Sequence, residues 1–474
     1  MSTDVKEPRL EYSNALPGVV RNRAAVSGGR AVKKGGVRFL APLASMCCNT
    51  TYDTNGLGTI SYTANLTIEG QAAYNKYLDN AYFYAATQRT VDGLVGLIFS
   101  KDPSKSELPT QVEYIKENAD GKGSSLRDLS KAGCREAFTS DWSGYLVARP
   151  STPEGSSEKD VEDNNLRPKL LHYKFENIIN WDYEVVNNVE KLSLLILKES
   201  TTKRDGFKVE NEAQYRVLEL KEGIYHQSVY DKDGGLISLS EPVVINGQNS
   251  DEIPFFWVEE PSNNEAPING LVDANFQHYN LYADYGGKLH YSSFVIYTET
   301  GAEANANNLM GNGVKWNNRN PDAKFEVLQP DGSSDGHRIA LQDMEQRMAA
   351  LGAEQLKPRV SGAESAEAKG LDQVAQNSTT ADVAMTVSDA LTKAINFASR
   401  WMGGEENTEY ELNTDYNPTS MDAQTLRELF AVYLGGGITY ETFYSNLQRG
   451  EFARPDKTAE EEKEGITLNG TGME

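Results

Sequence analysis

A short stretch of the chain could supply a nucleophile. "GSSDG" at 332–336 matches G-x-S-x-G, in which a serine stands on a sharp turn between a strand and a helix, and the flanking residues predict that context. Such a hydrolase also needs an acid and then a histidine later in the chain, but His337, three residues away, is the only histidine beyond Ser334. The sequence therefore favours a turn in which Ser333, Ser334 or Asp335 caps the next helix, and a serine esterase using Ser334 is the unlikelier alternative.

A second stretch, "DANFQHYNLYADYGGKLHYS" at 273–292, gathers tyrosines, two histidines and two aspartates in one predicted helix. Residues that share a metal on a helix stand three or four positions apart, whereas His278 and His290 lie on opposite flanks of the apolar face. We therefore predict packing residues here, with no metal and no cofactor.

The same helix separates polar from apolar side chains at about 100° per residue. One narrow polar stripe contains Asp273, Gln277, Asn280, Asp284 and Lys288. Phe276, Tyr279 and Tyr282 lie on the broad opposite face, where we expect helix contacts within or between subunits. This pattern is typical of a helix in an assembly that leaves one edge in water.

Other catalytic signatures are missing from the sequence. It has no G-x-x-x-x-G-K-[ST], no H-E-x-x-H and no complete G-x-G-x-x-G, and "GNG" at 311–313 is too little for a phosphate loop. Cys47 and Cys48 are adjacent and Cys134 stands apart, a usage that indicates reduced thiols.

Length and composition set broad limits. A chain of 474 residues that is 39% hydrophobic can bury a sizeable core in several domains. Its longest apolar run, around 93–99, is far shorter than the roughly 20 residues of a membrane span, and no signal-peptide pattern opens the chain. We expect a protein made in the cytoplasm that does not enter a membrane.

The formal net charge of −23 argues against a general phosphate-binding face, which would be basic. Charge is nevertheless uneven, because residues 1–40 are rich in lysine and arginine and the tail from 451 contains a run of glutamates. Such runs are most often solvated faces.

Periodicity along the chain predicts an α+β fold. Residues 1–70 look loop-rich, one or two helices follow over 74–103, and another covers 125–138. Strands are predicted in "WSGYLVARP", "KLSLLILKES", "AQYRVLEL" and "IYHQSVYD", with an exposed insertion at 150–166. Helices are then predicted over 267–291, 337–356 and 380–402, with a β-like segment between the first two and two short helices around Gly435–Gly437.

A series of motifs occurs in order along most of the chain, and together they resemble the portal proteins of tailed double-stranded DNA bacteriophages, in particular a siphophage-type subfamily. The motifs are "VRNRAAVSGGRAVKKGGVRFLAPL", "AYFYAATQRTVDGLVGLIFSKDP", "RPKLLHYKFENIINW", "IPFFW", "LVDANFQHYNLYADYGGKLHYS" and "RPDKTAEEEKEGI". Residues 43–70 and the middle of the segment 293–331 match nothing in that family.

The resemblance implies a portal fold in a ring, usually of twelve subunits. It assigns an N-terminal segment and mixed α/β wing to 1–266, a first stem helix to 267–292, a β-containing clip to 293–331, and a second stem helix to 332–356. It assigns a channel loop to 357–372, a long wing helix with a return strand to 373–418, and a helical crown with an acidic tail to 419–474. Lys357, Arg359 and Lys369 would be the DNA-facing cations of the loop, and Lys315 and Trp316 partner-binding residues of the clip.

By the same resemblance, the ring stands at one capsid vertex of the virion and is the channel for DNA packaging and ejection. It is assembled in the cytoplasm of a host bacterium. Its partners would be the DNA, the terminase large subunit, the head–tail connector, the major capsid protein and the scaffolding protein. The chain itself would have no catalytic activity, and another head–tail connector ring is the alternative.

Overall fold

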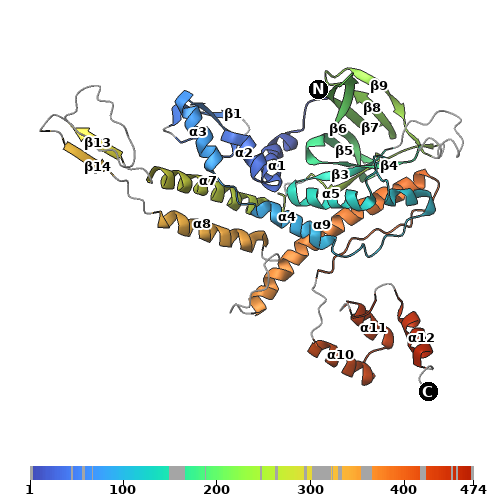
Figure 1. The fold of residues 1–474 in the computed structure, drawn as a ribbon. Helices are drawn as coiled ribbons and strands as arrows, with labels where there is room; N and C mark the ends of the chain where they lie inside the picture. The colour runs from blue at the N-terminus through green and yellow to red at the C-terminus, as the bar shows by residue number, and fades with distance from the viewer. Residues whose placement is uncertain are drawn as a thin grey trace. The chain divides into compact units, whose positions relative to one another are not determined.

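The structure is a computed structural model that describes residues 4–43, 46–55, 59–66, 68–148, 166–186, 188–245, 248–261, 265–292, 296–300, 322, 324–328, 334–353, 366–416, 423–449, 452–454 and 457–470. The chain forms two compact units, Met1–Thr414 and Asp415–Glu474. Helices and antiparallel sheets occur in separate runs along the chain, which confirms the predicted α+β class (Figure 1).

The first 70 residues are not loop-rich, so that prediction is wrong. They form helices α1 (Leu10–Ser27) and α2 (Gly29–Gly35), then the antiparallel hairpin of β1 (Cys47–Asn55) and β2 (Thr59–Leu66). Helix α1 contains Pro17 and buries mostly small side chains such as Ala24 and Ala25, so its sequence has little helical period. At Gly28 a φ of +87° lets the chain turn between the two helices.

Three further helices complete this region. The segment predicted as one or two helices forms two, α3 (Ile68–Asn80) and α4 (Ala86–Ile98), and the next prediction is confirmed by α5 (Leu126–Thr139). The start of α5 is fixed by a capping box, in which Ser125 Oγ accepts from the Asp128 N–H and Asp128 Oδ2 accepts from the Ser125 N–H, both at 3.1 Å.

Two antiparallel sheets follow, and the predicted strands are confirmed. The first has the order β12 (Phe255–Glu259), β3 (Ser143–Ala148), β4 (Lys169–Tyr173). The second has the order β5 (Ile178–Val186), β6 (Val189–Asp205), β7 (Lys208–Lys221), β8 (Ile224–Tyr230), β9 (Leu236–Pro242). Separately, β10 (Val244–Ile245) pairs with β11 (Gln248–Asn249). Their common core contains Trp142, Phe175, Trp181, Leu195 and Leu218.

The predicted helix 267–291 is observed as α7 (Asn269–Ser292), and the β-like segment contains the antiparallel strands β13 (Ile296–Thr300) and β14 (Lys324–Leu328). Helix α8 (Asp335–Met348) is shorter than predicted because its backbone widens into a π-helical segment, Ala349–Ala353. In this segment Leu351 is 55% exposed and Gly352 is buried.

Helix α9 (Ala366–Trp401) begins earlier than predicted. Residues 366–372, which the resemblance assigns to the end of the channel loop, are helical. Ala366, Glu367, Ala368 and Lys369 are strong helix formers, and a lone Gly370 does not break the run. After Trp401 the expected return strand is reduced, within residues 402–416, to a single bridge between Glu411 and Lys105.

An apolar stripe runs along α9 at spacings of three and four residues, and its members Val383, Val387, Leu391, Ile395 and Ala398 are all buried. The helix packs on β3, β12 and α5. Gly133 of α5 permits the close approach of β3, because a Cβ there would lie 2.1 Å from Tyr145 Oη, whose hydroxyl donates to Leu129 O at 3.0 Å.

The second unit is helical. It contains α10 (Ala423–Leu434), α11 (Tyr440–Arg449) and α12 (Ala459–Gly470), and the first two confirm the short helices predicted around Gly435–Gly437. Across the described residues of both units, every helix is too short or too polar to be a transmembrane segment.

Candidate functional site

Helices α7 and α8 form an antiparallel pair. His278 of α7 contacts Glu345 of α8, whereas Tyr285, further along α7, contacts His337, which lies earlier in α8. Residues that advance along one helix thus meet residues that recede along the other, and the two ribbons run side by side in Figure 1.

The aromatic face of α7 packs inside the subunit. The Phe276 ring lies 5.1 Å from Phe39 and 5.7 Å from Phe83, and Tyr279 also lies 5.7 Å from Phe83. Phe276 and Tyr279 are buried, and the partly buried Tyr282 lies 5.5 Å from Tyr82. Of the two kinds of contact expected for these residues, the structure describes those within one chain.

The polar stripe of α7 stays on the surface, but parts of it have partners. Asp273, Gln277, Asn280 and Asp284 are exposed and Lys288 is half-buried. Asp273 is paired with Arg21 of α1, and Asp284 accepts from the Tyr77 hydroxyl of α3 at 2.7 Å. The two carboxylates therefore tie α7 to α1 and α3.

Sequence reasoning missed a buried amide in α7. Asn275 is fully buried; its Oδ1 accepts from the Thr87 hydroxyl at 2.8 Å and its Nδ2 donates to Tyr84 O at 2.7 Å. A buried polar group is costly unless it is hydrogen-bonded, so these bonds fix α7 against the start of α4. The sequence contains a sign of this buried residue, because Asn275 interrupts an otherwise apolar face of the helix.

His278 lies deeper than its predicted place at the edge of the apolar face. Its side chain is 1% exposed and lies between the rings of Tyr84 and Tyr282, and its Nε2 is 3.4 Å from Glu345 Oε1. Burial lowers the pKa of this imidazole, although Glu345 opposes the shift. The other predicted flank residue, His290, lies with Nε2 3.1 Å from Lys76 Nζ.

The structure describes the predicted clip and channel-loop residues only in part. Lys315, Trp316, Lys357 and Arg359 lie outside the described residues. Lys369 lies in α9, and only its backbone is described.

Ser334 occupies the N-cap position of α8, with its carbonyl accepting from the Arg338 N–H at 3.1 Å. The predicted cap is thus present in position, but the serine side chain makes no capping hydrogen bond. Its φ of −121° is an ordinary value, whereas the serine of a nucleophile elbow stands on a strained turn. The neighbouring His337 packs against Tyr285 with 6.4 Å between ring centres.

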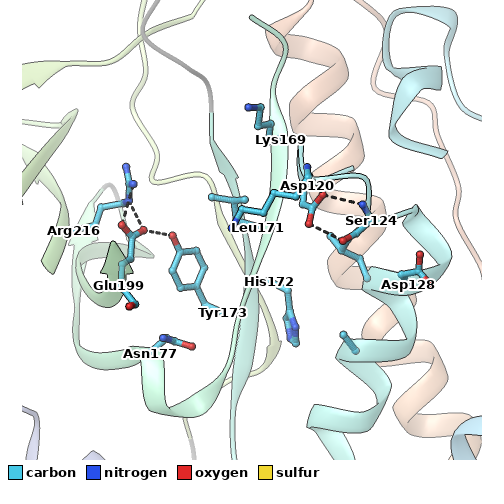
Figure 2. Close-up of a pocket in the computed structure, with 15 residues that line it drawn as sticks. Asp120, Ser124, Asp128, Lys169, Leu171, His172, Tyr173, Asn177, Glu199 and Arg216 are labelled. Carbon is cyan, nitrogen blue, oxygen red and sulfur yellow. Dashed lines mark hydrogen bonds and ion pairs between the residues drawn. The ribbon is translucent and has the colours of Figure 1, made fainter. Parts of the chain in front are cut away.

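A polar pocket of about 700 Å³ lies between α5 and strands β4, β6 and β7, as Figure 2 shows. On its sheet side Glu199 accepts from Arg216 Nε at 2.7 Å, from Arg216 Nη2 at 3.1 Å and from Gln214 at 2.7 Å, and Tyr173 also donates to it. Burial raises the pKa of Glu199, but Arg216 outweighs this and the net shift is downward. The pair is therefore held as an ion pair.

On the helix side of this pocket, a hydroxyl and a carboxylate form a hydrogen bond. Ser124 Oγ donates to Asp120 Oδ2 at 2.7 Å, and Asp120 Oδ1 accepts from the backbone N–H of Lys122 at 2.7 Å (Figure 2). Burial raises the pKa of Asp120, but these hydrogen bonds lower it overall. A carboxylate with a lowered pKa is a weak base, so the arrangement suits a stabilised turn better than proton transfer.

His172 also lines the pocket, on β4. Its ring stacks 5.0 Å from Tyr145, and burial lowers its pKa to about 4. The imidazole is therefore neutral near pH 7. In the described part of the chain, no three His, Cys, Asp or Glu side chains stand close enough together to hold a metal ion.

A family model described as "Domain of unknown function (DUF4055)" matches residues 267–402, the segment that contains α7, β13, β14, α8 and α9. No curated protein matches the chain. Among solved structures, the chain is similar to one in "Neck of empty GTA particle computed with C6 symmetry", with 11% identity, a TM-score of 0.37, and 88% of this chain and 99% of that chain covered. Values this low leave fold and function to be argued from the residues of this protein.

Proposed function

We propose that this protein is a phage portal subunit, one copy of a ring at a capsid vertex through which double-stranded DNA is packaged and ejected. The order of elements carries the proposal. A mixed α/β body is followed by two antiparallel helices with a β hairpin between them in sequence, then by one long helix and a separate helical unit. The resemblance implies the same order of wing, stem, clip, stem, wing helix and crown.

In this assignment α7 and α8 are the stem helices, and β13 and β14 belong to the clip. The family match over 267–402 supports treating stem, clip and long helix as one unit, because it starts just before α7 and ends just after α9. The aromatic contacts and the Asn275 hydrogen bonds anchor α7 firmly in the body, as a channel wall that must withstand passing DNA requires.

The acidic composition suits passage of DNA better than capture. A wall of mostly negative charge repels phosphates and keeps the duplex from sticking, whereas a basic wall would bind it. In this proposal the chain hydrolyses nothing, and the terminase large subunit supplies the packaging motor. The connector, the major capsid protein and the scaffolding protein are its other partners in the virion.

The channel loop is assigned to the residues before α9, with Lys357 and Arg359 in it and Lys369 in the first turns of the helix. We expect replacement of all three by alanine to leave assembly unchanged and to alter DNA packaging or retention. The effect should shrink at high salt, since exposed charges are screened. A triple variant that fails to assemble would contradict the placement.

Deletion of the gene from the genome that encodes this chain tests the proposal. Portal function predicts that the remaining particles contain no DNA, because DNA has no entry to the capsid. Capsids that fill with DNA but carry no tails would instead indicate a head–tail connector. DNA-filled, tailed particles in normal numbers would overturn both.

A further inference from the structure

The β6–β7 hairpin extends as a ribbon beyond its sheet. Strand β5 pairs with β6 only as far as Leu197, and β8 pairs with β7 only from Tyr215 onward. The two strands then continue alone to the turn at Gly206–Phe207, where Asp205 pairs with Lys208. Gly206 has a φ of +59°, which suits the first position of a tight hairpin turn.

The tip of this ribbon carries an aromatic ring in water. The side chain of Phe207 is fully exposed and Val209 is 60% exposed. Lys208 is paired with Glu210 at 2.5 Å, which leaves Lys203 and Arg204 set against Asp205. The hairpin tip therefore exposes apolar side chains beside a small excess of positive charge.

A pocket of about 480 Å³ on the same unit could receive a side chain such as that of Phe207. Its wall includes the aromatic side chains of Tyr183, Phe256 and Trp257, and a volume of this size can take a side chain or small ligand. Aromatic faces also attract lysine and arginine.

The charge of this pocket is acidic. Lys191 at its edge is already paired with Asp251 at 3.0 Å, and Glu252 is paired with Arg400. Of the remaining charged residues that line the pocket, Glu190, Glu260 and Asp389 are negative and Lys393 is positive, so the local charge is negative. The pocket therefore complements the tip in both polarity and charge.

The chain cannot fill its own pocket with its own tip. Glu190 and Leu192 line the pocket at the start of β6, while Lys203 and Asp205 lie at the other end of that strand. At about 3.3 Å per residue, the strand separates tip and pocket by roughly 40 Å. An occupant of matching chemistry must come from another molecule.

We propose that the β6–β7 hairpin tip of one copy docks into the Tyr183–Trp257 pocket of the next copy. A contact between two different patches of the same chain is head-to-tail, and such contacts close into rings when repeated around an axis. The inference rests on the proposed function, since it requires a ring, and it names the surfaces that join neighbours.

Cysteine cross-linking tests the contact. Phe207→Cys is combined with Thr386→Cys, a pocket position on α9, and the assembly is treated with a short bismaleimide. The expected result is a ladder of covalent multimers in denaturing gels. Phe207→Cys with Glu113→Cys, an exposed position outside the pocket, is the matched control, and wild type controls for Cys47, Cys48 and Cys134.

The outcomes separate the two proposals. Rings that give no more cross-linking than the control overturn the docking contact and leave the portal proposal intact. A wild-type chain that stays monomeric overturns both.

A charge swap gives a second measurement. Lys203→Glu and Phe207→Ser should each weaken association of copies about tenfold or more, the usual effect of a central anchor. Asp389→Lys should restore association to the Lys203→Glu variant, because the tip and the pocket then have opposite charges again. Rings that form equally well with Phe207→Ser show that the tip serves a different partner, which overturns the inference.

Discussion

His278 of α7 and Glu345 of α8 face each other with 3.4 Å between Nε2 and Oε1. The imidazole is 1% exposed and the carboxylate 46% exposed. Within the described residues neither ring nitrogen has a hydrogen-bond partner. The charge state of one buried imidazole therefore decides whether this contact between the two helices is an ion pair.

The first prediction concerns pH. Burial lowers the pKa of His278, so below about pH 6.5 the unfolded chain binds a proton that the folded chain does not. Stability is thus retained above pH 6.5 and lost as the pH falls through it. Between about pH 7.5 and 5.5 the thermal midpoint of wild type should fall further than that of His278→Phe, which keeps an aromatic ring between Tyr84 and Tyr282.

Glu345→Gln serves as the comparison for this pH experiment. It removes the carboxylate that favours the protonated imidazole, so its midpoint should fall at least as steeply as that of wild type. Identical pH slopes in wild type and His278→Phe would contradict the assignment.

The second prediction concerns the aromatic face of α7. Phe276 is 4% exposed and contacts Phe39 and Phe83, so Phe276→Ala should cost about 3 to 5 kcal/mol of unfolding free energy. Gln277→Ala, on the exposed stripe, should change it by less than about 0.5 kcal/mol. Denaturant unfolding measures both, and equal losses would show that the two faces are not distinguished as described.

The third prediction concerns a buried ion pair. Arg23 Nη1 donates to Glu136 Oε2 at 2.7 Å and its Nε donates to Glu176 Oε1 at 2.6 Å, while the Glu136 side chain is 2% exposed. Arg23→Ala would leave the buried carboxylate of Glu136 without its cationic partner and should cost about 3 to 5 kcal/mol.

Arg135→Ala is the control for this measurement. Its pair with Asp92 is surface-exposed, at 45% and 47%, and should contribute only about 0 to 1 kcal/mol. Similar costs for the two arginines would contradict the burial of the Arg23 pair.

The fourth prediction concerns Ser334. Because its side chain makes no capping bond, Ser334→Ala should change stability by less than about 0.5 kcal/mol, below the usual cost of losing a cap. A fluorophosphonate probe should leave the serine unmodified. Covalent labelling of Ser334 that is lost in the alanine variant would establish the esterase alternative.

Strong periodicity made some elements predictable. Helix α7 and the buried stripe of α9 follow from apolar residues that recur every three or four positions, and β6 and β7 follow from their β-branched and aromatic runs. Helix α1 was missed because its buried positions are small and Pro17 interrupts the pattern. A local pattern cannot report a helix stabilised mainly by what packs on it.

The candidate site was less predictable, because its contacts join residues far apart in the chain. The pairs Asp273–Arg21 and Asp284–Tyr77 use stripe residues that pattern alone leaves in water. The match between Phe207 and the Tyr183–Trp257 pocket likewise becomes visible only when the exposure of the Phe207 ring and the residues that line the pocket are known. Periodicity shows which face a residue occupies, while its partner depends on the tertiary fold.

Electron microscopy of the purified full chain tests the central claim most directly. Negative-stain class averages are predicted to show a closed ring with rotational symmetry and an axial hole wide enough for duplex DNA. A compact particle of one chain, or an open filament, at concentrations where portal rings should be assembled would contradict the account.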